Sequence, residues 1–169
     1  LATASPDGPV RLWNTDTGDE EVRPLQADFS RTWMMAATFS PDGRWLAVGG
    51  AGWEVARCQI FEVATGRLVR NLAGHNTMVQ DVAFSRDGRW LATPGYEGTA
   101  RVWSVNPVAE FLSLEGHDSA VWCVAFSRDG KKIASGSFDL TARVWDADTG
   151  AMLETIMVGF PVVSLAFSP

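Results

Sequence analysis

The chain has 169 residues, of which 46% are hydrophobic and 20% charged, a balance that excludes a disordered chain and leaves enough apolar side chains for a core. Its 14 Lys and Arg residues stand against 20 Asp and Glu residues, and the net charge of −6, with the basic residues widely spread, argues against a nucleic-acid partner. No apolar run is long enough to cross a membrane and residues 1–8 lack the pattern of a signal peptide, so we expect a cytoplasmic protein without a membrane partner.

Cysteine and histidine are too sparse for a disulfide framework or a zinc site. The chain has two of each, and Cys58 and Cys123 lie far apart in the sequence. Two free thiols packed in strands are the simpler interpretation. The sequence therefore predicts neither a metal nor another cofactor.

One phrase recurs along the chain at a nearly constant interval. It reads Ala-Thr-Phe-Ser-Pro-Asp-Gly-Arg-Trp-Leu-Ala at 37–47, returns with few changes at 82–92 and 124–134, and begins again at 165–169. The phenylalanines of the four copies, at positions 39, 84, 126 and 167, are 45, 42 and 41 residues apart. A period of about 40–45 residues is typical of propeller blades.

Each unit is predicted to form four short strands. In the last complete unit, apolar runs at 121–126, 132–136, 141–145 and 151–156 are separated by turn residues, among them Asp129-Gly130, which is a strong hairpin signal. No segment has the apolar spacing and caps of a helix. In chain order, we expect a first unit made of residues 1–26 plus 160–169, followed by units at 28–72, 75–114 and 117–157.

These units resemble the blades of WD-repeat β-propellers. The resemblance rests on the Gly-His pairs at 74–75 and 116–117, the Phe-Ser-x-Asp-Gly turns, and Arg-Val-Trp at 101–103 and 143–145, and it extends over essentially the whole chain. It implies an all-β fold, a β-propeller of four-stranded antiparallel blades with four blades per chain. Residues 1–5 align with the second strand of the other units and residues 162–167 with the first, so we expect the N- and C-terminal strands to share one blade.

Four units leave the closure of the ring open. The chain can form a compact four-bladed monomer, pair head-to-tail with a second copy as a homodimer in an eight-bladed ring, or be part of a larger propeller. The mass in solution distinguishes the paired ring from a monomer.

The resemblance also implies a hydrogen-bonded tetrad of His, Ser or Thr, Asp and Trp inside each blade. The last blade matches it with His117, Ser135, Asp139 and Trp145, and the blade before it offers His75, Thr93 and Trp103, with Glu97 where Asp is expected. The second blade has no matching His and has Phe61 at the Trp position. Since Ser135 falls inside a predicted strand and no Gly-x-Ser-x-Gly motif occurs, we interpret the His, Ser and Asp as structural and predict no catalytic residues. Arg101 and Arg143 are expected on a solvated strand face.

In WD-repeat proteins, partner contacts concentrate on the top face of the propeller, so the resemblance implies a set of partner-binding positions. Carried over by alignment, they are unusually aromatic for positions that face water: Trp33, Met35, Trp53, Met78, Tyr96, Trp122 and Phe138.

The expected function is therefore that of a non-enzymatic scaffold that binds a peptide or protein segment on this face. A sensor or regulatory segment of a larger multidomain protein is the alternative. An enzyme or small-ligand binder that uses the central channel is a weaker one, because Asp81 is the only acidic residue expected near the channel.

Overall fold

All regular elements in the described part of the chain are strands. The structure, a computed structural model, describes residues 1–5, 8–21, 25, 32–52, 56–105 and 112–168, and these form 14 strands. Within those residues no helix is long and apolar enough to span a membrane. The expected all-β class is confirmed.

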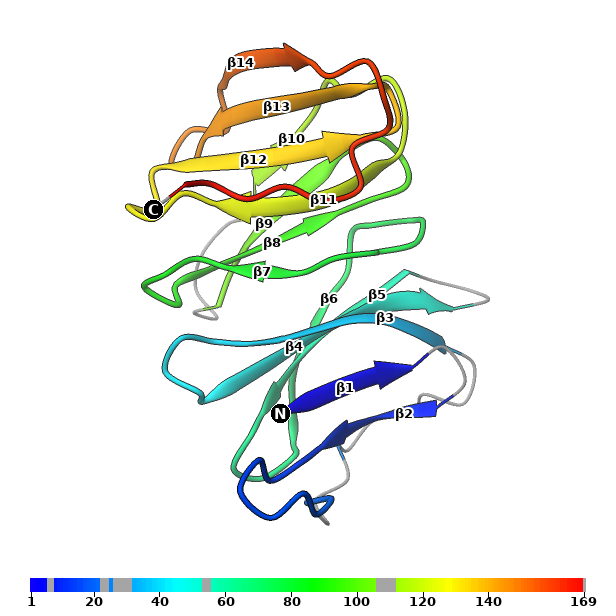
Figure 1. Cartoon of the computed structure of the whole chain (residues 1–169), viewed down its shortest axis with the longest axis vertical. Coiled ribbons are helices and arrows are strands. Elements are labelled where there is room, and N and C mark those ends of the chain that lie inside the picture. The colour runs from blue at the N-terminus through cyan, green and yellow to red at the C-terminus, as the bar shows by residue number, and fades with distance from the viewer. Residues whose placement is uncertain (6–7, 22–24, 26–31, 53–55, 106–111, 169) are drawn as a thin grey trace.

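The strands form one two-stranded and three four-stranded antiparallel sheets, each built from consecutive strands. They follow one another along the long axis of the molecule (Figure 1). In chain order the sheets consist of β1 (Ala2–Ser5) and β2 (Gly8–Leu12); of β3 (Thr32–Phe39), β4 (Trp45–Gly52), β5 (Ala56–Glu62) and β6 (Leu68–Leu72); of β7 (Ala83–Phe84), β8 (Trp90–Pro94), β9 (Ala100–Ser104) and β10 (Leu112–Leu114); and of β11 (Val121–Phe126), β12 (Lys132–Ser137), β13 (Thr141–Asp146) and β14 (Met152–Met157).

The Asp-Gly turns between the first two strands of each four-stranded sheet are held by the same local contacts. In the last sheet, Asp129 accepts hydrogen bonds from the Ser127 hydroxyl (2.7 Å) and from the backbone N–H of Lys131 (3.1 Å). Gly130 adopts a φ of 72°, a conformation that glycine reaches at little cost. The repeated Ser-x-Asp-Gly phrase thus encodes a repeated hairpin.

One turn uses a different residue for the same backbone conformation. Gly98 lies between β8 and β9 with a φ of 89°, and the equivalent residue between β12 and β13 is Leu140, with a φ of 70°. Leu140 is the only described residue other than glycine with a positive φ.

The core lies in the seams between neighbouring sheets. The alternation of strand side chains sends every second residue toward the preceding sheet and the others toward the following one. Between the second and third sheets, Ile60 and Leu72 pack against Leu91 and Trp103, and between the third and fourth, Val102 packs among Val121, Ile133 and Trp145. The second and third sheets are therefore covered on both faces.

The expected sharing of one blade by the two ends does not occur within a single chain. Residues 158–168 form no strand, and they lie beside the last sheet, where the N–H of Val162 donates to the carbonyl of Ser137 (3.0 Å). Figure 1 places them at the opposite end of the molecule from β1 and β2.

Candidate functional site

Three aromatic rings meet on one end of the third and fourth sheets. We call this end the top face and define it by the connections 73–78, 95–99, 115–120 and 137–140. Trp122 lies on β11, and its ring centroid is 5.6 Å from that of Tyr96 and 4.9 Å from that of Phe138. We name these three residues the aromatic cluster.

Backbone hydrogen bonds hold the outer two rings against the central one. The N–H of Tyr96 donates to the carbonyl of Met78 (3.2 Å), and the N–H of Phe138 donates to the carbonyl of Ala120 (3.0 Å). Tyr96 is 42% exposed and Phe138 38% exposed, whereas Trp122 is half-buried between them. The cluster is thus an apolar surface that spans two sheets and is open to solvent.

The other expected partner-binding residues are not part of the cluster. Trp33 and Met35 lie on β3, two sheets away from Trp122, and both are exposed. Met78 is half-buried and joins the cluster through its backbone contact with Tyr96. Trp53 lies outside the described residues.

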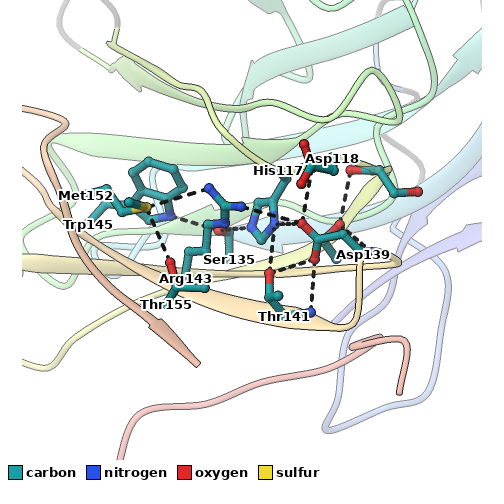
Figure 2. A network of polar contacts seen from close by, with 11 residues as sticks. His117, Asp118, Ser135, Asp139, Thr141, Arg143, Trp145, Met152 and Thr155 are labelled. Carbon is teal, nitrogen blue, oxygen red and sulfur yellow. Dashed lines mark hydrogen bonds and ion pairs between the residues drawn. The ribbon is translucent and has the colours of Figure 1, made fainter. Parts of the chain in front are cut away.

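Below the top face, the fourth sheet contains a continuous chain of hydrogen bonds (Figure 2). The Trp145 indole N–H donates to the Ser135 hydroxyl (2.8 Å), Ser135 contacts Nε2 of His117 (2.8 Å), and Nδ1 of His117 contacts Oδ2 of Asp139 (2.7 Å). Asp139 also accepts from the Thr141 hydroxyl (2.6 Å). An indole donates only and a carboxylate accepts only, so these four groups can satisfy one another away from water.

Burial and hydrogen bonding fix the charge states of this network. Burial opposes the ionisation of Asp139, but hydrogen bonds from Thr141, His117 and the backbone N–H of Asp118 outweigh it and hold the pKa of Asp139 well below its usual range. Burial lowers the pKa of His117 despite the neighbouring carboxylate. A neutral imidazole that donates from Nδ1 and accepts at Nε2 agrees with both of its contacts.

The third sheet builds the same network with a longer acid. The Trp103 indole donates to the Thr93 hydroxyl (2.7 Å), Thr93 contacts Nε2 of His75 (2.8 Å), and Nδ1 of His75 contacts Glu97. The Thr77 hydroxyl also donates to Glu97. Burial opposes the ionisation of Glu97, but these hydrogen bonds outweigh it and lower its pKa to about 2.

The first sheet contains a partial network that was not predicted from the sequence. The Trp13 indole N–H donates to the Thr3 hydroxyl (2.8 Å). The signal was present, because Thr3 and Trp13 are ten residues apart, as are Ser135 and Trp145. In the second sheet, Val48 and Phe61 occupy these positions and are buried without a hydrogen bond between them.

The expectation of a solvated strand face for Arg101 and Arg143 is wrong. Their side chains are largely buried and lie 3.9 Å from Glu97 and Asp139, respectively. An arginine stem packs well against apolar surface while its charged end reaches the carboxylate, which explains the burial.

Asp81, the acidic residue expected near the channel, bridges two sheets. Its carboxylate accepts hydrogen bonds from the N–H groups of Val82 (2.8 Å) and, across the seam, Val124 (3.1 Å). Burial raises the pKa of Asp81 against the opposing effect of these bonds. Among the residues that the structure describes, no three His, Cys, Asp or Glu side chains gather as a metal site requires.

Comparison with known proteins agrees with these networks. The family model described as "WD domain, G-beta repeat" matches residues 66–104 and 109–146, and each of these segments contains one complete network, that of His75 and that of His117, respectively. These two segments of the chain are WD repeats.

Its WD-repeat relatives are longer proteins. Nuclear distribution protein nudF of Aspergillus niger is 31% identical over 80 residues, which cover 47% of this chain and 17% of the relative. Jouberin of Rattus norvegicus is 34% identical over 75 residues, or 43% of this chain and 7% of the relative. The U3 snoRNP-associated protein-like EMB2271 of Arabidopsis thaliana is 26% identical over 118 residues, which cover 60% of this chain and 24% of the relative. The chain thus spans less than a quarter of the length of each of these relatives.

A solved structure shares the arrangement of the sheets. A propeller chain from a crystal structure of a mitotic checkpoint complex matches all of this chain with a TM-score of 0.81 and 26% sequence identity, and 53% of that propeller chain is covered. The WD-repeat sheets described above therefore have the stacking of propeller blades. WD-repeat propellers are in general non-catalytic and bind protein partners.

The depressed pKa of Glu97 predicts an acid-sensitive WD-repeat blade. A carboxyl whose pKa is lower in the folded chain stabilises the fold fully above its unfolded pKa, about 4.3, and that contribution is lost as the pH falls through the folded pKa. With a folded pKa of about 2, the loss falls between these two values. We expect Glu97→Gln to lower the melting temperature at pH 7 and to flatten its decline in this acid range.

A pH series of thermal melts followed by circular dichroism measures this effect. Glu115→Gln is the matched control, because Glu115 is exposed on the same face. If the melting temperature of Glu97→Gln fell as steeply toward acid pH as that of the unmodified chain, the lowered pKa of Glu97 would be contradicted.

Proposed function

We propose that this chain is a non-enzymatic scaffold that binds a peptide or protein segment through the aromatic cluster on its top face. The observation that carries the proposal is the contact of three partly exposed rings, Tyr96, Trp122 and Phe138, across two neighbouring blades. Exposed apolar surfaces of this kind are typical of interaction sites, and Trp and Tyr are enriched among the residues that dominate binding energy.

The charges near the cluster favour a basic partner segment. The connections that define the top face contain no Lys or Arg, and their exposed acidic residues are Glu115 and Asp118. The carboxylates of Glu97 and Asp139 are instead held in the hydrogen-bonded networks, next to Arg101 and Arg143. Opposite charge on the partner speeds association and selects against acidic competitors.

The hydrogen bonds of Asp81 and of the tetrads favour a scaffold over an enzyme. A general acid or base needs a proton-transfer position open to substrate. Asp81 instead accepts two backbone N–H groups, and His117 is bonded through both ring nitrogens. The same binding face can serve an independent scaffold or a regulatory segment of a larger protein.

Truncation of the central ring and of one outer ring tests the proposal. We expect Trp122→Ala and Phe138→Ala each to weaken partner binding by about tenfold or more, equivalent to about 1.4 kcal/mol, with a nearly unchanged melting temperature. The probe is a peptide selected from a random phage-displayed library against the immobilised chain, and its affinity is measured by isothermal titration calorimetry.

The controls separate the cluster from general apolar surface. Val69→Ala removes an exposed side chain of β6, away from the top face, and is expected to leave affinity unchanged. Tyr96→Phe keeps the ring and should bind nearly as well as the unmodified chain. If the selected peptides bound Trp122→Ala with full affinity, the aromatic cluster would not be the binding site. A large loss of stability in that variant would mean that Trp122 belongs to the core rather than to a binding surface.

A further inference from the structure

The hairpin turns between the first two strands of the four-stranded sheets bring together basic residues that lie far apart in the sequence. These turns, residues 40–45, 85–90 and 127–132, lie at one edge of the molecule (left in Figure 1). Neighbouring turns are close to one another, since a Cβ on Gly88 would lie 3.6 Å from Cδ of Pro41. We call them the bottom turns, because they lie at the opposite end of the strands from the top face.

The bottom turns are positively charged, although the chain as a whole is acidic. They contain six of the 14 Lys and Arg residues and only three Asp residues, which gives them a net charge of +3. The remainder of the chain therefore has a net charge of −9. The number of basic residues rises from one turn to the next: Arg44 in the first, Arg86 and Arg89 in the second, and Arg128, Lys131 and Lys132 in the third.

Some of these basic side chains already have a partner and others do not. Nε of Arg89 lies 2.7 Å from Oδ2 of Asp87 in its own turn. The Arg44 guanidinium lies 4.5 Å from the centre of the Trp45 ring. Among the described residues, no carboxylate lies within ion-pair distance of the three exposed side chains of Arg86, Arg128 and Lys132.

The same three side chains line one cavity. It has a volume of about 550 Å³ and is lined by Arg86, Ser127, Arg128, Asp129, Lys132 and Ser168. Five of these six residues belong to the bottom turns and supply all of its charged groups. The one carboxylate, that of Asp129, already accepts from the Ser127 hydroxyl (2.7 Å) and the backbone N–H of Lys131 (3.1 Å). The cavity thus has an excess of positive charge.

The hairpins do not need basic residues at these positions. The first bottom turn has Pro41 at the position of Arg86 and Arg128, and Trp45 at the position of Lys132. In all three turns a serine hydroxyl nevertheless donates to the aspartate two residues later. The serine, aspartate and glycine therefore determine the turn, and the basic side chains are available to a ligand.

We propose that the bottom turns of the third and fourth sheets bind a short acidic peptide segment, whose carboxylates pair with Arg86 and Arg128. The planar fork of a guanidinium holds a carboxylate through two parallel hydrogen bonds. Lys132 adds a third cation at the same cavity. This site goes beyond the proposed function, since the aromatic cluster lies at the other end of the strands.

The charge distribution favours a short acidic segment over a long polyanion. Salt screens exposed charges beyond a Debye length of about 8 Å at physiological ionic strength, so a short segment interacts mainly with the bottom turns. A long nucleic acid would also extend over the remainder of the chain, whose net charge of −9 repels it. With an acidic top face and basic bottom turns, one chain could hold two partner segments of opposite charge.

Fluorescence anisotropy at low ionic strength tests the proposal. The probe is a fluorescein-labelled peptide of four Glu-Ser repeats, and its Gln-Ser counterpart is the uncharged control. We expect the Glu-Ser peptide to bind saturably, and Arg86→Glu combined with Arg128→Glu to weaken binding by about tenfold or more. Because the first bottom turn forms with Pro41, this double variant is expected to keep its melting temperature.

A charge-matched variant separates the site from the net charge of the chain. Arg11→Glu combined with Arg67→Glu makes the same change in charge at two exposed positions outside the bottom turns, 48% and 60% exposed. We expect it to bind the peptide within about twofold of the unmodified chain. Equal losses in the two double variants, or no saturable binding by the unmodified chain, would overturn the proposal.

Two further measurements identify the class of partner and the face that binds it. A labelled five-nucleotide oligothymidine has four phosphates, as many charges as the peptide has glutamates, and is expected to bind more weakly. If it bound more tightly than the peptide, the bottom turns would be a nucleic-acid site and the proposal would be wrong. Trp122→Ala is expected to bind the acidic peptide as the unmodified chain does, so this proposal and the proposed function can fail separately.

Discussion

Trp145→Ala is expected to lower the free energy of unfolding by about 3–5 kcal/mol, the cost of truncating a large buried aromatic side chain. Trp145 is 1% exposed in the seam between the third and fourth sheets. It also donates its indole N–H to Ser135, so the truncation removes apolar contacts and one link of the tetrad together. Urea unfolding followed by circular dichroism measures the loss.

Two matched variants separate the contributions of packing and hydrogen bonding at this position. Trp145→Phe keeps most of the apolar volume but leaves the Ser135 hydroxyl without its indole donor, so we expect a smaller loss of about 1–3 kcal/mol. Trp33→Ala truncates an exposed tryptophan and is expected to cost less than about 1 kcal/mol. A Trp145→Ala loss no larger than that of Trp33→Ala would place Trp145 outside the core.

Asp139→Ala is expected to lower the free energy of unfolding by about 3 kcal/mol, because each buried donor left without an acceptor costs about 1–3 kcal/mol. The Asp139 carboxylate accepts from His117, from the Thr141 hydroxyl and from the backbone N–H groups of Thr141 and Asp118. Its removal leaves several of these donors unsatisfied at once. The measurement is the same urea titration.

The comparison for Asp139 is a second aspartate that also caps a turn. Asp129 accepts from Ser127 and from the backbone of Lys131, but it is exposed, so water can replace its carboxylate. We expect Asp129→Ala to cost about 1 kcal/mol or less. Similar losses for the two variants would mean that the tetrad adds nothing beyond a capped turn.

The repeat made most of the fold predictable. Its period, its Asp-Gly turns and its alternating apolar residues are local properties of the sequence, and they specify four short strands in each unit. The expected strand at 141–145 corresponds to β13, and the one at 132–136 to β12. The positions of Tyr96, Trp122 and Phe138 followed from the resemblance alone.

The contacts between units could not be predicted in the same way. Where the two ends lie depends on the angle between stacked sheets, which is set by how whole side chains fill a seam rather than by any local pattern. The inter-sheet bond from Val124 to Asp81 has no signal in the sequence for the same reason. The burial of Arg143 likewise depends on a neighbouring carboxylate, which alternation along the strand does not reveal.

The left-handed backbone of Leu140 reveals a compromise in the fourth blade. A residue with a Cβ costs about 1–2 kcal/mol more than glycine in this conformation, and the third blade avoids that cost with Gly98. Leu140 shares its turn with Phe138 and is itself exposed, so the leucine enlarges the apolar surface beside the rings. Thermostability engineering that restored glycine there would relieve the backbone and shrink the very surface on which recognition is proposed to depend.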